Sequence, residues 1–150
     1  MHLILVRHGD AGAYTLPDHA RNLSPLGTQQ AAMTAAWLQQ HYQPDHLIVS
    51  PYHRAQQTLA KICQGFAEVP ITTLDCITPD EDASTAVNQL GDLPGECLVV
   101  VCHMPIIAKI AGILTGEPPE AFALAEARVY DMGIIAPNLA VEITRFVPTC

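Results

Sequence analysis

The segment Leu5-Val6-Arg7-His8-Gly9 ends a short apolar run with an arginine, a histidine and a glycine. A neutral imidazole can attack phosphorus in line, and a guanidinium fork matches the oxygens of a phosphoryl group. Gly9 has no Cβ, so the backbone can turn sharply there and a ligand can approach closely. We therefore predict that His8 is a nucleophile and that Arg7 binds phosphoryl oxygens beside it. Nearby arginines disfavour a further cation and would keep His8 in the unprotonated form that attacks.

Three further side chains complete the set. Arg54 is expected in the first turn of a helix, where a cation is unfavourable to the helix dipole unless an anion shares the site. His103 ends the apolar run Cys97 to Cys102, and a second imidazole can donate a hydrogen bond to equatorial phosphoryl oxygens. Arg21 lies in a loop, where an ordinary solvated charge is the common alternative. Because the chain has only seven Lys and Arg and a net charge of -8, three arginines at such positions predict an anion site.

The acidic stretch Asp80-Glu81-Asp82 could bind a metal or supply a general acid. Capping of the following helix by Asp82, with the other two carboxylates solvated, is the commoner explanation. The three residues are therefore kept only as possible proton donors.

The order of the elements predicts an α/β fold. Strand-like runs are expected at 3–6, 46–50, 69–74, 97–102, 127–135 and 139–147, and helices after Ser24-Pro25, Ser50-Pro51, Asp82 and Met104-Pro105. Strands that alternate with helices favour a mostly parallel central sheet with helices on both faces, which is a three-layer α/β/α sandwich. Ligands of such sheets bind outside the carboxyl ends of the strands, where the first histidine and its arginine would lie.

Length and composition indicate one domain spanning residues 1–150. The net charge of -8 disfavours a nucleic-acid or anionic-membrane surface. No apolar run approaches the roughly 18 residues that a membrane span needs, and the N-terminus lacks the pattern of a signal peptide, so we expect a cytoplasmic protein. Its five cysteines are odd in number and lack C-x-x-C spacing, which argues against a disulfide framework and a zinc site.

The chain resembles the histidine phosphatase (phosphoglycerate mutase-like) superfamily in four segments that follow the family's order. They are Leu5-Val6-Arg7-His8-Gly9, Arg21-x-Leu23-Ser24-x-x-Gly27, Ser50-Pro51-x-x-Arg54-Ala55-x-Gln57-Thr58 and the late His103. The resemblance implies a phosphoglycerate mutase-like fold and a transiently phosphorylated His8. It also implies that Arg7, Arg21, Arg54 and His103 form the phosphate pocket. No cofactor and no metal are expected, because the arginines supply the positive charge.

Within that superfamily the chain looks most like the short SixA-type phosphohistidine phosphatases. It shares their Arg-His-Gly-Asp opening, their small size and a late Cys102-His103-Met104-Pro105 segment. Superfamily members that act on small molecules carry a glutamate general acid in a motif that is missing here, and only Asp80, Glu81 and Asp82 stand in that region. The imidazole of phosphohistidine leaves more readily than an alkoxide, so such an acid can be weak or absent.

The expected function is therefore removal of phosphate from phosphohistidine on a signalling protein, such as a histidine-containing phosphotransfer domain. A monomer is expected. One alternative is a phosphatase of small phosphate esters with Asp80, Glu81 or Asp82 as the acid. Others are a non-catalytic phosphohistidine-binding module, and an α/β domain whose histidines are structural.

Overall fold

A computed structural model describes all 150 residues of the chain. Six strands form one sheet, and four α-helices and two short 3-10 helices connect them. In chain order the elements are β1 (His2–Arg7), η1 (Asp18–Ala20), α1 (Pro25–His41), β2 (His46–Val49), α2 (His53–Cys63), β3 (Ile71–Thr73), η2 (Asp75–Ile77), α3 (Ala83–Gly91), β4 (Cys97–Cys102), α4 (Ile106–Thr115), β5 (Ala127–Asp131) and β6 (Val141–Phe146).

The sheet is mixed, and its parallel part carries the strand ends that the sequence singles out. The strand order is β3-β2-β4-β1-β5-β6. β1 and β2 both pair in parallel with β4, and β3 is parallel to β2. β5 is antiparallel to both of its neighbours, β1 and β6. The carboxyl ends of β1, β2 and β4 therefore meet at one edge of the sheet.

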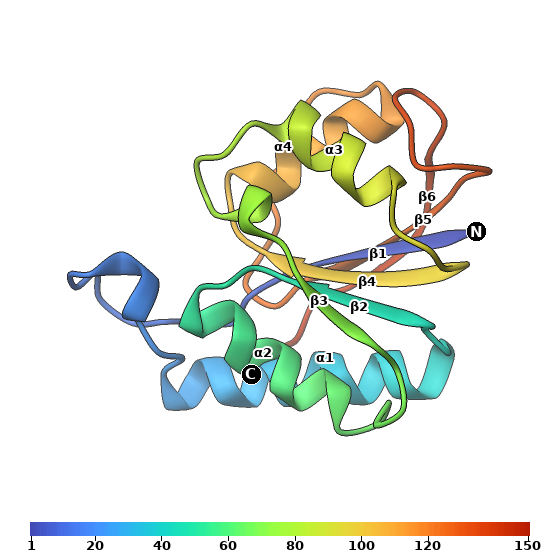
Figure 1. Ribbon diagram of the computed structural model, residues 1–150. Helices are drawn as coiled ribbons and strands as arrows, with labels where there is room; N and C mark the ends of the chain where they lie inside the picture. Colours follow the sequence, from blue (N-terminus) through green and yellow to red (C-terminus); the bar gives the residue numbers. More distant parts are fainter.

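Helices cover both faces of the sheet. In Figure 1, α1 and α2 lie below it and α3 and α4 above it. Successive residues of the central strands enter opposite cores: Leu3 and Leu5 pack with α3 and α4, and Ile4 and Val6 pack with α1 and α2. These strands are apolar throughout because both of their faces are buried. The predicted three-layer sandwich with a mostly parallel sheet is confirmed. None of the four helices is long and apolar enough to cross a membrane.

One predicted helix start is wrong. Helix α2 begins at His53 with Tyr52 in the N-cap position, two residues later than the Ser50-Pro51 pattern indicates. Ser50 is fully buried and its hydroxyl contacts a histidine instead. The other such pattern is confirmed, because Ser24 Oγ accepts a hydrogen bond from the Gly27 amide at the start of α1.

Candidate active site

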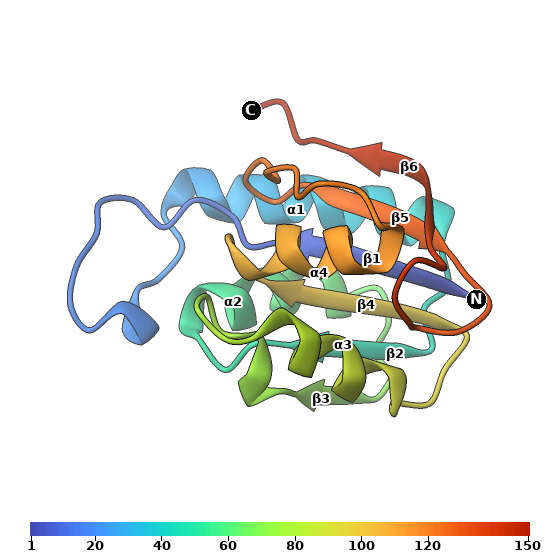
Figure 2. The same cartoon turned by 90° about the horizontal axis from the view of Figure 1, so that it is seen from above.

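The carboxyl ends of β1 and β4 and the first turn of α2 surround a pocket of about 300 Å³. The long loop between β1 and α1 contributes to its wall and projects beyond the sheet edge (Figure 2, blue). The structure thus brings together residues from distant parts of the sequence. The lining residues are Arg7, His8, Asp10, Ala11, Gly12, Arg21, Arg54, Met104 and Leu124.

Both ring nitrogens of His8 have a hydrogen-bond partner. Its Nδ1–H donates to the Gly9 carbonyl at 2.7 Å, so Nε2 carries the lone pair. Arg54 Nε donates to that Nε2 at 3.3 Å. Burial, followed by the charges of Arg54, Arg7 and Arg21, lowers the pKa of His8 to about 4, although the Gly9 carbonyl opposes the shift. The imidazole is therefore neutral at physiological pH, and its Nε2 has the lone pair that nucleophilic attack requires.

This arrangement makes a pH prediction. The His8 imidazole should titrate near pH 4, because its cationic form is poorly solvated and faces arginines. Between the unfolded pKa of about 6.5 and the folded value, the unfolded chain binds the proton more tightly. This contribution to stability therefore falls as the pH falls through that window. Imidazole NMR against pH, assigned with His8→Ala, measures the value, and titration near pH 6.5 would contradict the prediction.

The tautomer of His103 is set by Ser50. Ser50 Oγ accepts a hydrogen bond from the Tyr52 amide at 3.2 Å and lies 2.7 Å from His103 Nε2. Because the imidazole is the acceptor that the structure offers to this hydroxyl, Ser50 donates to Nε2 and the ring proton resides on Nδ1. Burial, together with His8, Arg54 and Arg7, lowers the pKa of His103 and keeps it neutral. Sequence reasoning missed Ser50, although it lies at the end of a predicted strand.

Three buried donors at the site have no partner within the protein: Arg7 Nε, Arg21 Nε and His103 Nδ1. The rings of His8 and His103 lie 5.1 Å apart, centroid to centroid, so His103 stands beside the nucleophile. Unpaired buried donors are costly, and an anion that accepts from them would remove that cost. A phosphoryl group has the charge and the number of oxygens to do so.

Asp18 of η1 forms ion pairs with Arg21 and Arg54. Its carboxylate accepts from Arg21 Nη1 at 3.1 Å and from Arg54 Nη2 at 3.2 Å, and its carbonyl accepts from Arg54 Nη1 at 2.8 Å. Partial burial opposes ionisation, but the hydrogen bond from Arg21 and the charge of Arg54 hold the pKa of Asp18 below its usual value. Asp18 is therefore an ionised carboxylate. No sequence signal pointed to it, because the contact depends on how the loop folds back.

Gly9 and Gly27 fix the position of the loop that carries His8. A Cβ on Gly9 would lie 2.5 Å from the Gly27 carbonyl oxygen, and a Cβ on Gly27 would overlap the Asp10 backbone. The loop that carries His8 therefore passes directly against the first turn of α1. The Gly9 amide also donates to Thr58 Oγ1 of α2 at 3.1 Å, which fixes the other side of the loop.

The acidic stretch lies outside this pocket. Asp82 caps α3 by accepting from the Thr85 amide at 3.0 Å, as the capping interpretation expected. Glu81 accepts from the Thr78 hydroxyl at 3.4 Å. Glu81 and Asp82 line a separate surface hollow with Lys109. None of Asp80, Glu81 and Asp82 is among the residues that line the pocket around His8.

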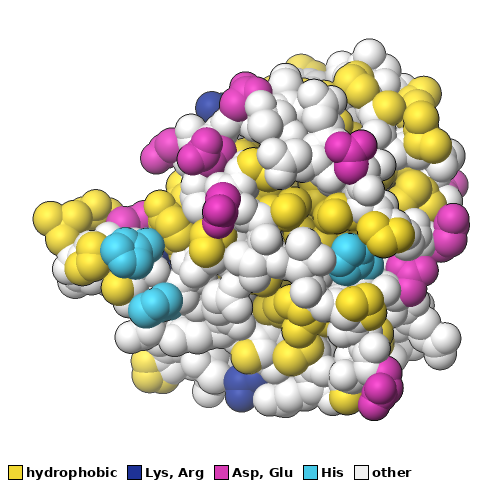
Figure 3. Space-filling model, in the orientation of Figure 1, with side chains coloured by type: hydrophobic (Ala, Val, Ile, Leu, Met, Phe, Trp, Pro, Cys, Tyr) yellow, Lys and Arg dark blue, Asp and Glu magenta, His cyan; other side chains and the backbone are white.

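The cations of the site are concealed from the surface. Figure 3, in the orientation of Figure 1, shows acidic side chains scattered over one face of the molecule and few Lys or Arg. Arg54 is only 4% exposed, and the Arg21 side chain is 16% exposed. Positive charge is therefore concentrated inside the pocket of a protein whose net charge is -8, and it is partly desolvated there. Such charges bind anions more strongly than exposed ones do.

Comparison with known proteins assigns the class. Residues 3–78 match the family model of the histidine phosphatase superfamily (branch 1), and this segment contains His8 and the three arginines of the pocket. The chain therefore belongs to the histidine phosphatase superfamily, whose members include phosphatases.

Two curated relatives and one solved structure are more specific. The chain is 32% identical over 129 residues to the phosphohistidine phosphatase SixA homolog of Haemophilus influenzae, covering 78% of this chain and 79% of that protein. It is 31% identical over 132 residues to phosphohistidine phosphatase SixA of Escherichia coli, covering 81% and 80%. The structure of the protein histidine phosphatase SixA complexed with tungstate shares the fold, with a TM-score of 0.87, 24% identity, and 98% and 97% of the chains covered. The resemblance to SixA-type enzymes is thus confirmed.

Proposed function

We propose that the protein hydrolyses phosphohistidine on another protein through a phosphorylated His8. The observation that carries the proposal is the neutral imidazole whose Nε2 faces the arginines, beside three buried donors without partners. The similarity to proteins named phosphohistidine phosphatase supports the same substrate class. The partner that we propose is a phosphotransfer protein of a signalling system, which presents its phosphohistidine on an exposed surface.

In the first step, His8 Nε2 attacks the phosphorus of the substrate in line. A P–N bond to His8 forms, and the P–N bond to the partner's imidazole breaks. The partner's imidazole takes the electron pair of that bond and leaves in its neutral form, because its other ring nitrogen carries a proton. Arg54 Nε turns from the nitrogen to a phosphoryl oxygen as the lone pair is used, and Arg7 and Arg21 bind the other oxygens. His103 donates its Nδ1–H to an equatorial oxygen as charge moves there.

In the second step, water attacks the phosphorus of phosphorylated His8. A P–O bond forms, the P–N bond breaks, and inorganic phosphate leaves with the ring returned to its neutral form. The Gly9 carbonyl holds the His8 ring in place through Nδ1 in both steps. The same arginines stabilise both transition states, because the charge spreads over the same three oxygens.

The carboxylates beside the pocket favour a nitrogen leaving group. Asp10 accepts from the Ser24 hydroxyl at 2.6 Å and from the Gly12 amide at 3.1 Å. Asp18 is ionised against two arginines, so neither side chain is set up to donate a proton. A departing alkoxide needs that proton, whereas a departing imidazole needs it far less. The site is therefore better suited to phosphohistidine than to a phosphate ester.

The test is phosphate release without added metal from a phosphohistidine-bearing phosphotransfer domain and from an alkyl phosphate such as glycerol phosphate, whose leaving group is an alkoxide. We expect kcat/KM to be about 100-fold or more higher for the phosphohistidine protein, since a positioned acid is worth roughly 10²- to 10⁴-fold in ester cleavage. A variant with Asp80→Asn, Glu81→Gln and Asp82→Asn should cleave phosphohistidine at the wild-type rate. Asn at position 82 still caps α3, so this control keeps the fold.

Two other outcomes would contradict this proposed function and indicate a different one. Comparable or faster ester hydrolysis, lost in the triple variant, would indicate a small-molecule phosphatase that uses the acidic stretch. Binding of the phosphohistidine protein without release of phosphate would indicate a binding module.

A further inference from the structure

The segment between α4 and β5 forms the support on which Arg7 and His8 rest. The Phe122 carbonyl accepts a hydrogen bond from Arg7 Nη1 at 2.8 Å. The Arg7 amide donates to the Glu126 carbonyl at 3.1 Å, and the Ala125 amide donates to the His8 carbonyl at 3.0 Å. The direction of the Arg7 guanidinium therefore depends on where residues 120–126 lie.

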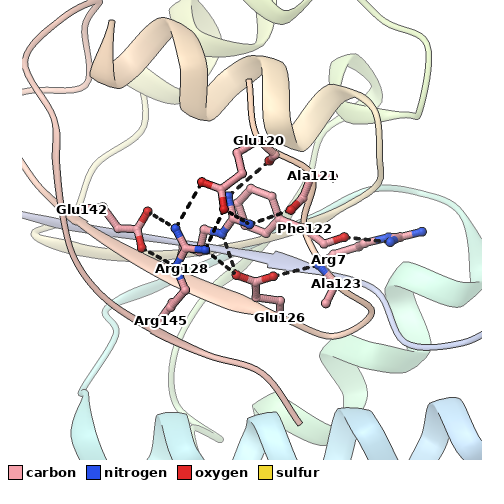
Figure 4. A network of polar contacts seen from close by, with 9 residues as sticks. All are labelled: Arg7, Glu120, Ala121, Phe122, Ala123, Glu126, Arg128, Glu142 and Arg145. Atoms are coloured by element: carbon pink, nitrogen blue, oxygen red, sulfur yellow. Dashed lines mark hydrogen bonds and ion pairs between the residues drawn. The ribbon is translucent and has the colours of Figure 1, made fainter. Parts of the chain in front are cut away.

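That segment has no helix or strand of its own, and one arginine of β5 holds it. Arg128 Nη2 donates to the Ala121 carbonyl at 2.7 Å, and Arg128 Nη1 donates to the Glu120 carbonyl at 3.2 Å. The guanidinium also lies over the Phe122 ring, 3.8 Å from its centroid. Figure 4 shows these contacts converging on the segment, with Arg7 at its far end.

Glu126 completes the support. Its Oε2 accepts from Arg128 Nε at 2.6 Å, and its Oε1 accepts from the Ala123 amide at 2.7 Å. Both side chains are buried, at 3% and 2% exposure for Glu126 and Arg128. We call this pair the Glu126–Arg128 clamp. A buried ion pair alone is weak evidence for stability. Here each of the three guanidinium nitrogens of Arg128 donates one hydrogen bond to the segment that supports Arg7.

We propose that Glu126 and Arg128 are positioning residues, which act through the Phe122 carbonyl to aim the Arg7 guanidinium at the phosphoryl group. The proposal rests on the proposed function of the pocket. With Nη1 held by that carbonyl, the Nε of Arg7 is left without a partner and is available to the ligand. Phosphoryl transfer depends on such alignment, because a misplacement of about 1 Å can cost about 100-fold in rate.

The test replaces the guanidinium of Arg128 with another group and keeps the positive charge. Arg128→Lys retains a cation beside Glu126 but cannot reach three acceptors at once. The control is Lys109→Arg, which exchanges an exposed cation of α4 that neither lines the His8 pocket nor contacts Glu126 or Arg128. We expect Arg128→Lys to weaken binding of inorganic phosphate, measured by calorimetry, and to lower kcat, each by about tenfold. Lys109→Arg should change neither.

A double-mutant cycle with Arg7→Ala separates positioning from general support. If the clamp acts through Arg7, adding Arg128→Lys to Arg7→Ala should cause no further loss of phosphate binding or kcat. An equal further loss in both backgrounds would overturn the proposal. If Arg128→Lys does not fold, Glu126→Gln provides the cycle, since its amide oxygen still accepts from the Ala123 amide while the pair with Arg128 is broken.

The two proposals fail in different ways. Phosphate binding that depends on Arg128 only when Arg7 is present, in a protein that does not release phosphate from phosphohistidine, would keep the clamp and reject the proposed function. A wild-type protein that binds no inorganic phosphate would overturn both.

Discussion

Replacing His8 with alanine is expected to abolish turnover and to leave no phosphorylated enzyme. The imidazole is the group that forms the covalent bond in the proposed mechanism, and His103 cannot substitute for it because Ser50 engages its Nε2. Loss of a nucleophile costs on the order of 10⁴-fold or more in kcat. The arginines that remain in His8→Ala still bind phosphate, so the loss should appear in kcat rather than in affinity.

The measurement is transfer of labelled phosphate from a phosphohistidine-bearing phosphotransfer domain, followed on the enzyme and in solution. Label should pass transiently through the wild-type enzyme and be absent from His8→Ala. His53→Ala is the matched control, because that histidine is exposed at the start of α2 and should retain full labelling. Unchanged phosphate release by His8→Ala would reject the covalent mechanism.

Replacing Arg54 with alanine has the second largest expected effect, a loss of about 10²- to 10³-fold in kcat. Arg54 contacts both His8, through Nε2, and the loop between β1 and α1, through Asp18. Its charge balances the oxygens as the phosphorus becomes five-coordinate. Asp18 keeps its contact with Arg21 in the variant, so the loop retains one of its attachments and the protein is expected to fold.

Single-turnover transfer, measured beside the thermal midpoint of unfolding, checks this expectation. Lys61→Ala removes a half-buried cation from the same helix, one that does not line the pocket, and should leave the rate unchanged, which controls for loss of charge as such. Arg54→Lys should recover only part of the rate, because a single ammonium lacks the guanidinium fork. A higher KM with an unaltered kcat in Arg54→Ala would mean that Arg54 binds substrate and transition state equally well.

Much of the fold could be predicted because its signals are local. The runs of β1, β2 and β4 are apolar on both faces, which only a covered sheet tolerates. Convergence of Arg7, His8 and Arg54 follows from the rule that parallel strand ends share an edge. Strand alternation with helices then leaves few arrangements of the sheet.

The contacts that tune the site could not be predicted in this way. Ser50 followed by proline is a helix-start pattern wherever it occurs, and its pairing with His103, 53 residues later, is tertiary. Asp18 meets Arg54 only because a loop without periodicity folds back. The clamp residues Glu126 and Arg128 are two apart, as ordinary strand neighbours on one face are. Nothing in that spacing says that they hold the segment beneath another arginine.

The contact between Gly9 and Gly27 restricts the mutations that the chain can accept. Neither residue has a functional group. A side chain at either position would nevertheless collide with backbone atoms unless the His8 loop moved away from α1. A change there would shift the nucleophile relative to its arginines while every group of the reaction stayed present. The projecting part of the loop, with Tyr14 and Leu16 exposed, meets no such limit. The side chains of that part of the loop can therefore change while the position of His8 relative to its arginines stays constant.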